Sequence, residues 1–205
     1  MDIAAVTGFD VSRETLEKLQ AYVAMIEKWN PAINLVARST LGQIWQRHIA
    51  DSLQVAEFLT QDQRLWCDIG SGGGLPGLVV AILAHDLAPG LRVDMVEVDQ
   101  RKSVFLRQVV RELGLTCRVH TSKIEDLPPM SADVLSARAL APLSSLCAYA
   151  KQHLAEGGVA IFPKGAQFAS ELNEAQKHWS FSVEQVESKT DPQARLLVLR
   201  EIEHV

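Results

Sequence analysis

Apolar residues recur at helical spacing in the first part of the chain. In the segment 12–29 they fall on one stripe, which is typical of an amphipathic helix. They are Leu16, Leu19, Val23 and Ile26. Ser12 is a suitable N-cap, and we expect Asn30-Pro31 to end the helix, because a residue before proline disfavours the helical conformation. A second, less regular helical region is predicted over 41–59, with Asp51-Ser52 as a candidate break.

From residue 64 onward, short apolar strands alternate with helices. The predicted strands are 64–69, 91–97, 117–121, 132–137 and 158–163. The predicted helices are 76–87, 100–114, 142–155 and 167–178. This alternation indicates a parallel sheet covered on both faces, with a turn at Glu156-Gly157-Gly158 before the fifth strand. Two final strands, 181–189 and 195–202, leave no room for a crossover helix and should pair as an antiparallel hairpin.

These elements predict an N-terminal helical region over 1–60 and an α/β domain over 61–205. Of the 205 residues, 47% are hydrophobic and 22% charged, which is ordinary for a globular protein. The net charge of −5 argues against indiscriminate nucleic-acid binding but leaves room for a local basic face. Without a membrane-spanning run or a signal-peptide pattern, we expect a cytoplasmic protein that makes no use of a membrane. Three distant cysteines indicate reduced, mostly buried thiols.

The strongest chemical signal is the segment 66–77, where an apolar strand leads through an acid into a glycine-rich turn and a helix. Gly70, Gly72 and Gly74 stand at alternate positions, where the absence of a Cβ lets the backbone approach a ligand. Asp68 lies two residues before the first of these glycines. The segment therefore predicts a nucleotide-like ligand at the carboxyl end of the first strand.

Two ligands compete for this loop. Residues 72–77 satisfy the dinucleotide pattern G-x-G-x-x-G, and Glu97 follows them by 20 residues, which suits an NAD-dependent oxidoreductase. Asp68, however, would repel a pyrophosphate, whereas it suits the positive amino group of S-adenosylmethionine. A dinucleotide loop also begins directly after its strand, and this pattern begins two residues beyond Gly70. We therefore favour S-adenosylmethionine as cofactor and S-adenosylhomocysteine as product.

Other residues that follow strands are candidates for the same site. Glu97 ends the second strand, where its carboxylate suits both hydroxyls of a ribose; Asp99 is its rival, and a solvated acid is the alternative. Ile124 follows the third strand and suits contact with an adenine face, with Glu125 at the adenine edge. Arg138 follows the fourth strand and is the strongest candidate near the reacting centre, with a surface cation as the alternative.

Several dispersed segments agree with one known family. They are Asn34-Leu35, 47–52, 68–77, Glu97 with Arg101-Lys102, 105–109, 137–139, Lys164-Gly165 and 195–198. On these segments the chain resembles the bacterial small-subunit ribosomal RNA methyltransferase G family, also called glucose-inhibited division protein B. The Gly-Gly-Gly-Leu-Pro-Gly loop and the His-Ile-x-Asp-Ser segment are the most specific elements of the resemblance.

The predicted fold resembles that of the class I S-adenosylmethionine-dependent methyltransferases, a Rossmann-like seven-stranded sheet with a terminal antiparallel hairpin, here with N-terminal helices added. The family resemblance implies methylation of a guanine N7 in the 530 loop of 16S ribosomal RNA. It also implies that Gly70, Leu75, Ile124-Glu125 and Arg138 contribute to the cofactor site. The expected partner is 16S ribosomal RNA or the small ribosomal subunit, and nothing in the sequence demands more than a monomer.

Candidate RNA contacts follow from position in the chain. Lys164, after the fifth strand, and Arg195, at the start of the last strand, suit phosphate contacts. His48 is a further candidate, with a partly buried histidine that orients Asp51 or Arg47 as the equal alternative. Arg107 and Arg111 lie one helical turn apart beside an apolar stripe, and we interpret them as a solvated helix face.

The implied reaction needs no general base, because guanine N7 presents a free lone pair. Residues 136–139 read Ser-Ala-Arg-Ala, which lacks the Asn/Asp-Pro-Pro-aromatic motif of exocyclic amine methylation. The cysteines fall on predicted core positions, and neither they nor the histidines show metal-ligand spacing, so we expect no metal. Three alternatives stay open: a methyltransferase for small molecules or proteins, an NAD-dependent oxidoreductase, and a cofactor-binding assembly factor without catalysis.

Overall fold

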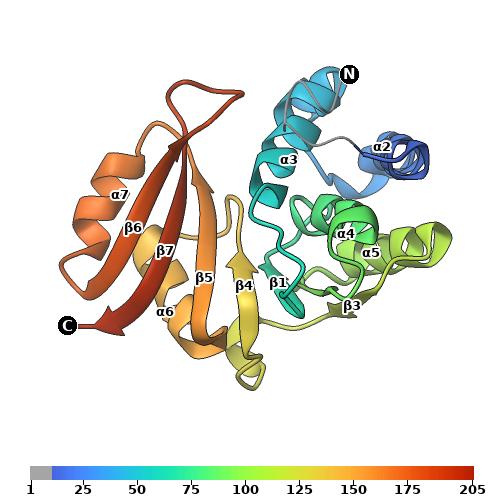
Figure 1. Cartoon of the computed structure of the whole chain (residues 1–205). Coiled ribbons are helices and arrows are strands. Elements are labelled where there is room, and N and C mark those ends of the chain that lie inside the picture. Colours follow the sequence, from blue (N-terminus) through green and yellow to red (C-terminus); the bar gives the residue numbers. More distant parts are fainter. Residues whose placement is uncertain (1–10) are drawn as a thin grey trace.

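Seven strands form one mixed sheet in the computed structural model, which describes residues 11–205 (Figure 1). The strands are β1 Leu65–Ile69, β2 Arg92–Val96, β3 Cys117–His120, β4 Ala132–Ser136, β5 Leu154–Lys164, β6 Trp179–Glu187 and β7 Arg195–His204. Their order is β3-β2-β1-β4-β5-β7-β6, with β1 to β5 parallel and β7 antiparallel to both of its neighbours. The predicted topology, five parallel strands followed by an antiparallel hairpin, is confirmed.

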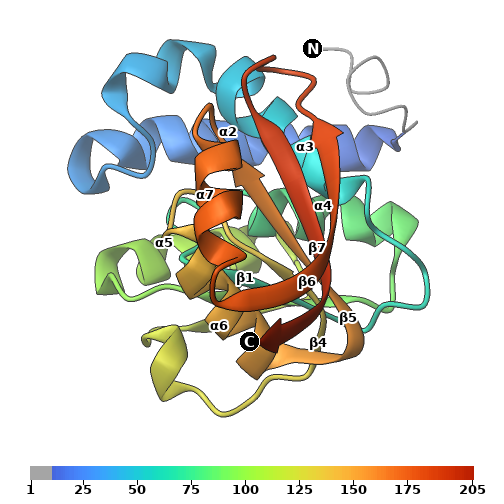
Figure 2. The ribbon, with the colours of Figure 1, turned by 90° about the vertical axis from the view of Figure 1, so that its left-hand side faces the viewer.

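Helices cover both faces of the sheet (Figures 1 and 2). They are α2 Arg13–Ile33, α3 Ala50–Ala56, α4 Gly77–Leu87, α5 Gln100–Leu113, α6 Leu143–His153 and α7 Phe168–Ala175. Shorter helical turns are η1 Arg38–Gln43, η2 Trp45–Ile49 and η3 Ile124–Asp126. Helices α4 and α5 pack on one face, beneath α2 and α3, and α6 and α7 pack on the other.

The first helix ends later than the sequence indicates. Ser12 caps α2 as predicted, accepting a hydrogen bond from the backbone N–H of Thr15 at 3.1 Å. The prediction that Asn30-Pro31 ends the helix is wrong, because α2 continues to Ile33. Proline in the last turn removes one backbone donor, and the buried Asn30 side chain secures the exit by accepting a hydrogen bond from Val36 N–H at 2.8 Å.

The predicted helical region over 41–59 is divided into three pieces. A 3₁₀ turn (η1) and a π turn (η2) precede the α-helix α3. The candidate break at Asp51-Ser52 is wrong: both residues lie inside α3, and the Ser52 hydroxyl donates to the carbonyl of His48 at 2.8 Å. The irregular part comes one turn earlier, at η2, a π-helical turn that contains His48.

The turn predicted at Glu156-Gly157-Gly158 is also wrong, since these residues lie within β5. The strand accommodates them as a bulge: Ala132 pairs with Leu154, whereas Val134 pairs with Val159. Gly157 has a φ of 75°, a left-handed conformation that glycine adopts readily. The glycines therefore interrupt the register of the strand without ending it.

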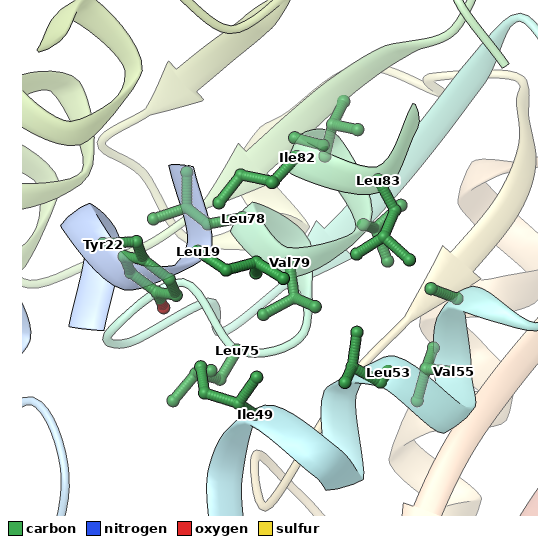
Figure 3. Packing of buried hydrophobic residues seen from close by; sticks show 14 of the residues in the cluster. Leu19, Tyr22, Ile49, Leu53, Val55, Leu75, Leu78, Val79, Ile82 and Leu83 are labelled. Carbon is green, nitrogen blue, oxygen red and sulfur yellow. The ribbon is translucent and has the colours of Figure 1, made fainter. Parts of the chain in front are cut away.

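The N-terminal elements and α4 share one buried core (Figure 3). Leu19 and Tyr22 from α2, Leu53 from α3 and Leu78 from α4 are all fully buried. Because α4 lies between the sheet and these helices, its sequence is apolar on every side, as expected for an enclosed helix. The division at residue 60 stays a prediction, and hydrophobic contact is continuous across it.

The remaining expectations concern thiols and membranes. Cys67 and Cys147 are buried and Cys117 is half-buried, all three as free thiols, as predicted. Among residues 11–205, no helix combines the length and the apolar character needed to cross a bilayer.

Tyr22 provides a test of the link between α2 and the β1–α4 loop. Its buried hydroxyl donates to the carbonyl of Gly73 at 2.7 Å. Tyr22→Phe leaves that acceptor unpaired, and we expect the free energy of unfolding to fall by ~1–2 kcal/mol in urea titrations. Tyr149→Phe is the matched control, because the Tyr149 hydroxyl bonds an exposed carboxylate, and it should change stability by less than ~0.5 kcal/mol. Equal losses in the two variants would contradict this interpretation.

Candidate active site

The glycine-rich loop between β1 and α4 lies at the carboxyl edge of the sheet. Gly70, Gly72 and Gly74 all have positive φ angles, and the amides of Gly70 and Ser71 donate to the carbonyl of Val96 at 2.8 and 3.1 Å. A Cβ on Gly74 would collide with Leu78. A Cβ on Gly72 would meet no atom closer than 3.8 Å, so one side of this turn is open to a ligand.

Asp68 fixes the shape of this loop from inside. The Trp66 indole N–H donates to Ser136 Oγ at 2.9 Å, and Ser136 donates to Asp68 Oδ1 at 2.7 Å. The other carboxylate oxygen accepts the N–H of Gly77 at 3.2 Å, and only 1% of the residue is exposed. The sequence expectation is that Asp68 faces the amino group of a ligand; here both of its oxygens hold β1, β4 and the start of α4 together.

Burial raises the pKa of Asp68 to about 6, against the hydrogen bonds from Ser136, Ser71 and Gly77 and the attraction of Arg138, which lower it. The carboxylate is therefore an acceptor near neutral pH and gains a proton in mildly acidic solution.

Glu97 joins the loop from the end of β2. Its Oε2 accepts the N–H of Gly72 at 2.7 Å and its Oε1 accepts the N–H of Asp99 at 2.7 Å. The residue is only 6% exposed, yet each carboxylate oxygen keeps a further lone pair. The sequence rival, Asp99, is engaged as the N-cap of α5, where it accepts the amides of Arg101 and Lys102.

The residues after β3 lie in the short turn η3. Ile124 is buried in the cluster that contains Ile69 and Val96, the last residues of β1 and β2. Glu125 is exposed, and the hydrogen bond from the Tyr149 hydroxyl at 2.6 Å is the main cause that lowers the pKa of its carboxyl. Leu75 is buried on the opposite side of the sheet, in the core shared with α2.

A cavity of about 670 Å³ opens beside the loop, over the carboxyl ends of β4 and β5. Its polar lining residues are Arg47, Asp51, Gln54, Arg138, Lys164, Gln167, Glu171, Ser188, Thr190, Asp191 and Arg195. Leu140 stands at its inner end, 41% exposed, with its side chain packed over Gly70. The cavity and the glycine loop are thus adjacent, with Leu140 between them.

Arg138 enters this cavity from the end of β4 and is held by the N-terminal segment. Its Nη1 lies 3.2 Å from His48 Nδ1 and 4.0 Å from Asp51 Oδ2. His48 Nε2 lies 2.7 Å from the Thr40 hydroxyl, which itself donates to the Ala37 carbonyl at 2.9 Å. Thr40 therefore accepts from Nε2–H, and His48 Nδ1 is left to accept from Arg138.

Burial, and then the charges of Arg138 and Arg47, lower the pKa of His48 to about 4. A neutral ring at physiological pH suits a hydrogen-bond acceptor for the guanidinium. Of the two interpretations left open by the sequence, the contacts favour an orienting histidine, but the residue that it orients is Arg138 and not Asp51 or Arg47.

Lys164 and Arg195 line the same cavity, but their donors are used within the protein. Lys164 Nζ donates to the Ala141 carbonyl at 2.8 Å and to Glu171 at 2.7 Å, and its side chain is 9% exposed. Arg195 donates to backbone carbonyls of residues 192 and 194, and its guanidinium carbon lies 5.4 Å from the Phe168 ring centroid. Both residues shape the cavity wall, and neither presents a fully free cation.

Sequence reasoning missed several cavity residues. Gln54 Nε2 donates to the Thr190 hydroxyl at 3.2 Å, and Gln54 Oε1 accepts the N–H of Lys189 at 2.6 Å, so α3 holds the β6–β7 loop over the cavity. These partners lie more than a hundred positions apart, and no local signal connects them. Leu140 carries no motif either. Among residues 11–205, no three His, Cys, Asp or Glu side chains are grouped so as to hold a metal ion.

Solved structures with the same architecture define the class of protein. The chain superposes on an S-adenosylmethionine-dependent methyltransferase from Aquifex aeolicus with a TM-score of 0.58 and 14% identity, over 88% of this chain and 97% of that one. It also superposes on a ribosomal protein L11 methylase from Lactobacillus delbrueckii subsp. bulgaricus with a TM-score of 0.59 and 14% identity, over 75% and 78% of the two chains. The fold is that of the class I S-adenosylmethionine-dependent methyltransferases, as predicted.

The sequence relatives define the family within that class. Residues 15–197 match the family of rRNA small subunit methyltransferase G. A protein of Cereibacter sphaeroides named ribosomal RNA small subunit methyltransferase G is 51% identical over 205 residues, which is the full length of both chains. The chain belongs to the rRNA small subunit methyltransferase G family, and the predicted family resemblance is confirmed.

The raised pKa of Asp68 predicts a pH dependence of stability. Between the unfolded carboxyl pKa near 4 and the folded value of about 6, the folded state binds more protons, so this group's contribution to stability falls as pH rises through that window. We therefore expect the free energy of unfolding of Asp68→Asn, relative to that of the native chain, to increase by ~1–3 kcal/mol as the pH rises from 4 to 7. Urea titrations of both proteins across this range measure the difference, in which the other titrating groups cancel. A pH-independent difference would show that Asp68 titrates normally.

Proposed function

We propose that this protein transfers a methyl group from S-adenosylmethionine to N7 of a guanine in the 530 loop of 16S ribosomal RNA. The observation that carries the proposal is that the glycine loop, which has an open side at Gly72 and is bonded by the Glu97 carboxylate, lies next to a cavity lined by Arg138. Family membership supports ribosomal RNA as the substrate.

The residues of the loop fit the cofactor. The open side of Gly72 leaves space for a nucleoside, and the spare lone pairs of Glu97 suit the two ribose hydroxyls. Gly70 lines the same turn, and Leu75 and Ile124 support it from the core on either side of the sheet. Glu125 suits the adenine edge and Arg138 the carboxylate of the methionine part. Asp68 acts by holding the loop in shape.

The bound cofactor supplies a methyl group activated by its sulfonium charge. Guanine N7 attacks with its own lone pair, so the chain needs to align the purine and exclude water, and alignment alone can supply much of the acceleration. Burial lowers the pKa of His48 and raises that of Asp68, and neither group is free to move a proton during the reaction. Both serve as positioning residues.

The cavity beside Leu140 suits a base turned out of the RNA. Arg138 can donate to an acceptor on the guanine edge. Lys164 and Arg195 stay candidates for RNA backbone contacts only through the donors that their bonds within the protein leave over. We propose that His48 acts on the RNA only through Arg138. The proposed partner is 16S ribosomal RNA or the small ribosomal subunit, met by a monomer in the cytoplasm.

Methylation of isolated particles tests this proposal. The protein is incubated with S-adenosylmethionine labelled in the methyl group and with small subunits from cells that lack the modification. We expect one labelled 7-methylguanosine per 16S ribosomal RNA, mapped by mass spectrometry to the 530 loop. Label on a ribosomal protein or on a small molecule would favour the other kinds of methyltransferase. Binding of S-adenosylhomocysteine without turnover on any particle would favour an assembly factor, and stabilisation by NAD alone would favour an oxidoreductase.

Glu97→Ala tests the cofactor site separately. It removes the carboxylate that accepts from Gly72, and we expect the affinity for S-adenosylhomocysteine to weaken by ~1–3 kcal/mol, measured by calorimetry. Glu112→Ala removes an exposed acid from α5 and serves as the matched control, with unchanged affinity. If Glu97→Ala retains native affinity, another group holds the ribose.

A further inference from the structure

One edge of the molecule carries a concentration of positive charge that the active site does not use. Residues 100–124 contain six cations and a single acid, Glu112, a net charge of +5 in a chain whose total is −5. The cations are Arg101, Lys102, Arg107, Arg111, Arg118 and Lys123. The sequence expectation for Arg107 and Arg111 is a solvated helix face. In the fold Arg107 gains partners outside α5, whereas Arg111 bonds Gln108 on the same helix.

These residues surround the edge strand β3, which pairs only with β2 in the described sheet (Figure 1). Helix α5 buries Phe105, Leu106 and Val109 and turns its basic residues outward. Arg118 is exposed on β3 itself, and Lys123 is exposed in the loop that follows. We name the group of Lys102, Arg107, Arg111, Arg118 and Lys123 the basic edge.

The charge of the basic edge is not neutralised within the protein. Among residues 11–205, none of its five cations has a carboxylate partner within 4.0 Å, whereas eleven of the other fifteen lysines and arginines have one. Several nearby acids have other partners: Asp99 bonds Arg101, Asp94 bonds Arg92 and His120, Glu112 accepts from Gln108, and Glu125 accepts from Tyr149. Glu125 also feels the charge of Lys123, without an ion pair within 4.0 Å. The clustering of unpaired cations is therefore specific to this edge.

The basic edge is also ordered and adjoins the cofactor loop. Arg107 Nη2 donates to the Val119 carbonyl at 3.2 Å and to the Thr121 hydroxyl at 2.6 Å, which fixes its guanidinium against β3 and leaves its other donors free. Helix α5 begins three residues after Glu97, and Lys123 directly precedes Ile124. The positive surface thus runs outward from the cofactor site, on the side away from the cavity.

We propose that the basic edge is a docking surface for the sugar–phosphate backbone of the substrate RNA, beyond the nucleotide that enters the cavity. The inference rests on the proposed function. Phosphate contacts fix the orientation of a protein on RNA and carry no sequence information, which suits a surface made of exposed cations at one edge. Contact on both sides of the cofactor favours one orientation of the protein on RNA, because the chain outside residues 100–124 is negatively charged overall.

The test neutralises two exposed cations that make no contact with the cofactor loop. The double variant Arg111→Gln/Arg118→Gln is compared with Arg13→Gln/Arg200→Gln, which loses the same charge from exposed residues already paired with Glu17 and Glu184. Thermal melting checks that both variants fold. Affinity for protein-free 16S ribosomal RNA and for unmethylated small subunits is measured over a range of KCl concentrations, together with kcat, KM and affinity for S-adenosylhomocysteine.

For the variant of the basic edge we expect RNA affinity to fall roughly 5- to 20-fold near 0.1 M KCl. The slope of log Kd against log[KCl] should decrease by about 1.5, because each of the two lost phosphate contacts contributes ~0.7–0.9 to it. KM for RNA should rise in parallel, while kcat at saturating RNA and cofactor affinity stay within about twofold of the native values. The control should match the native protein.

Three results would overturn the docking surface while leaving the proposed function intact. The first is an unchanged slope of log Kd against log[KCl], and the second is an equal loss of RNA affinity in the control variant. The third is a loss of affinity for assembled subunits without a loss for protein-free RNA, which would mean that the basic edge binds an acidic ribosomal protein. A native protein that neither binds nor methylates small-subunit RNA would overturn the proposed function together with the inference, and the unmutated chain alone reveals it.

Discussion

The buried Asp68 carboxylate is the contact on which the rest of the site depends. It joins Ser136 on β4, the amide of Gly77 at the start of α4 and its own strand β1, and so fixes the glycine loop relative to three elements at once. A carboxylate with 1% exposure is costly to keep charged, and its raised pKa records that cost. The three glycines with positive φ angles lie between this network and the bonds that Val96 and Glu97 make to the loop amides.

The N-terminal segment also contributes hydrogen bonds to the site. Tyr22 on α2 donates to the Gly73 carbonyl from one side of the loop, and His48 accepts from Arg138 on the other. Gln54 and Asp51 on α3 bond the loop between β6 and β7, across the mouth of the cavity. The N-terminal helices therefore contact both the glycine loop and the loop between β6 and β7 that lines the cavity.

The sequence predicts the parts of this molecule that depend on local periodicity and strand ends. Every predicted strand is present, and Glu97 lies against Gly72 because carboxyl ends of parallel strands meet at one edge. The errors at Pro31, at Asp51-Ser52 and at Gly157 have a common form: the chain continues through residues that locally favour a stop. Side-chain hydrogen bonds to nearby backbone groups accompany the first two, and a bulge accommodates the third.

Contacts between distant segments were beyond the reach of sequence reasoning. The bond between Gln54 and Thr190 depends on how α3 packs beside the hairpin, and the bond between Arg138 and His48 depends on how η2 packs beside the end of β4. Neither pairing leaves a periodic trace. The basic edge has the same origin, since Arg111 and Arg118 become neighbours of one surface only when α5 folds back along β3.

Shifted pKa values commonly mark acids and bases of a reaction, yet here they mark residues that position others. The pKa of Asp68 is raised, which favours its neutral acid form, and the pKa of His48 is lowered, which favours its neutral base form. Both side chains are enclosed by hydrogen-bond partners. An enzyme that moved protons would need one of them to meet solvent or substrate. Alkylation of a lone pair that is already free needs only geometry and a suitable field, so burial of both groups is consistent with chemistry that transfers carbon without transferring a proton at the attacking atom.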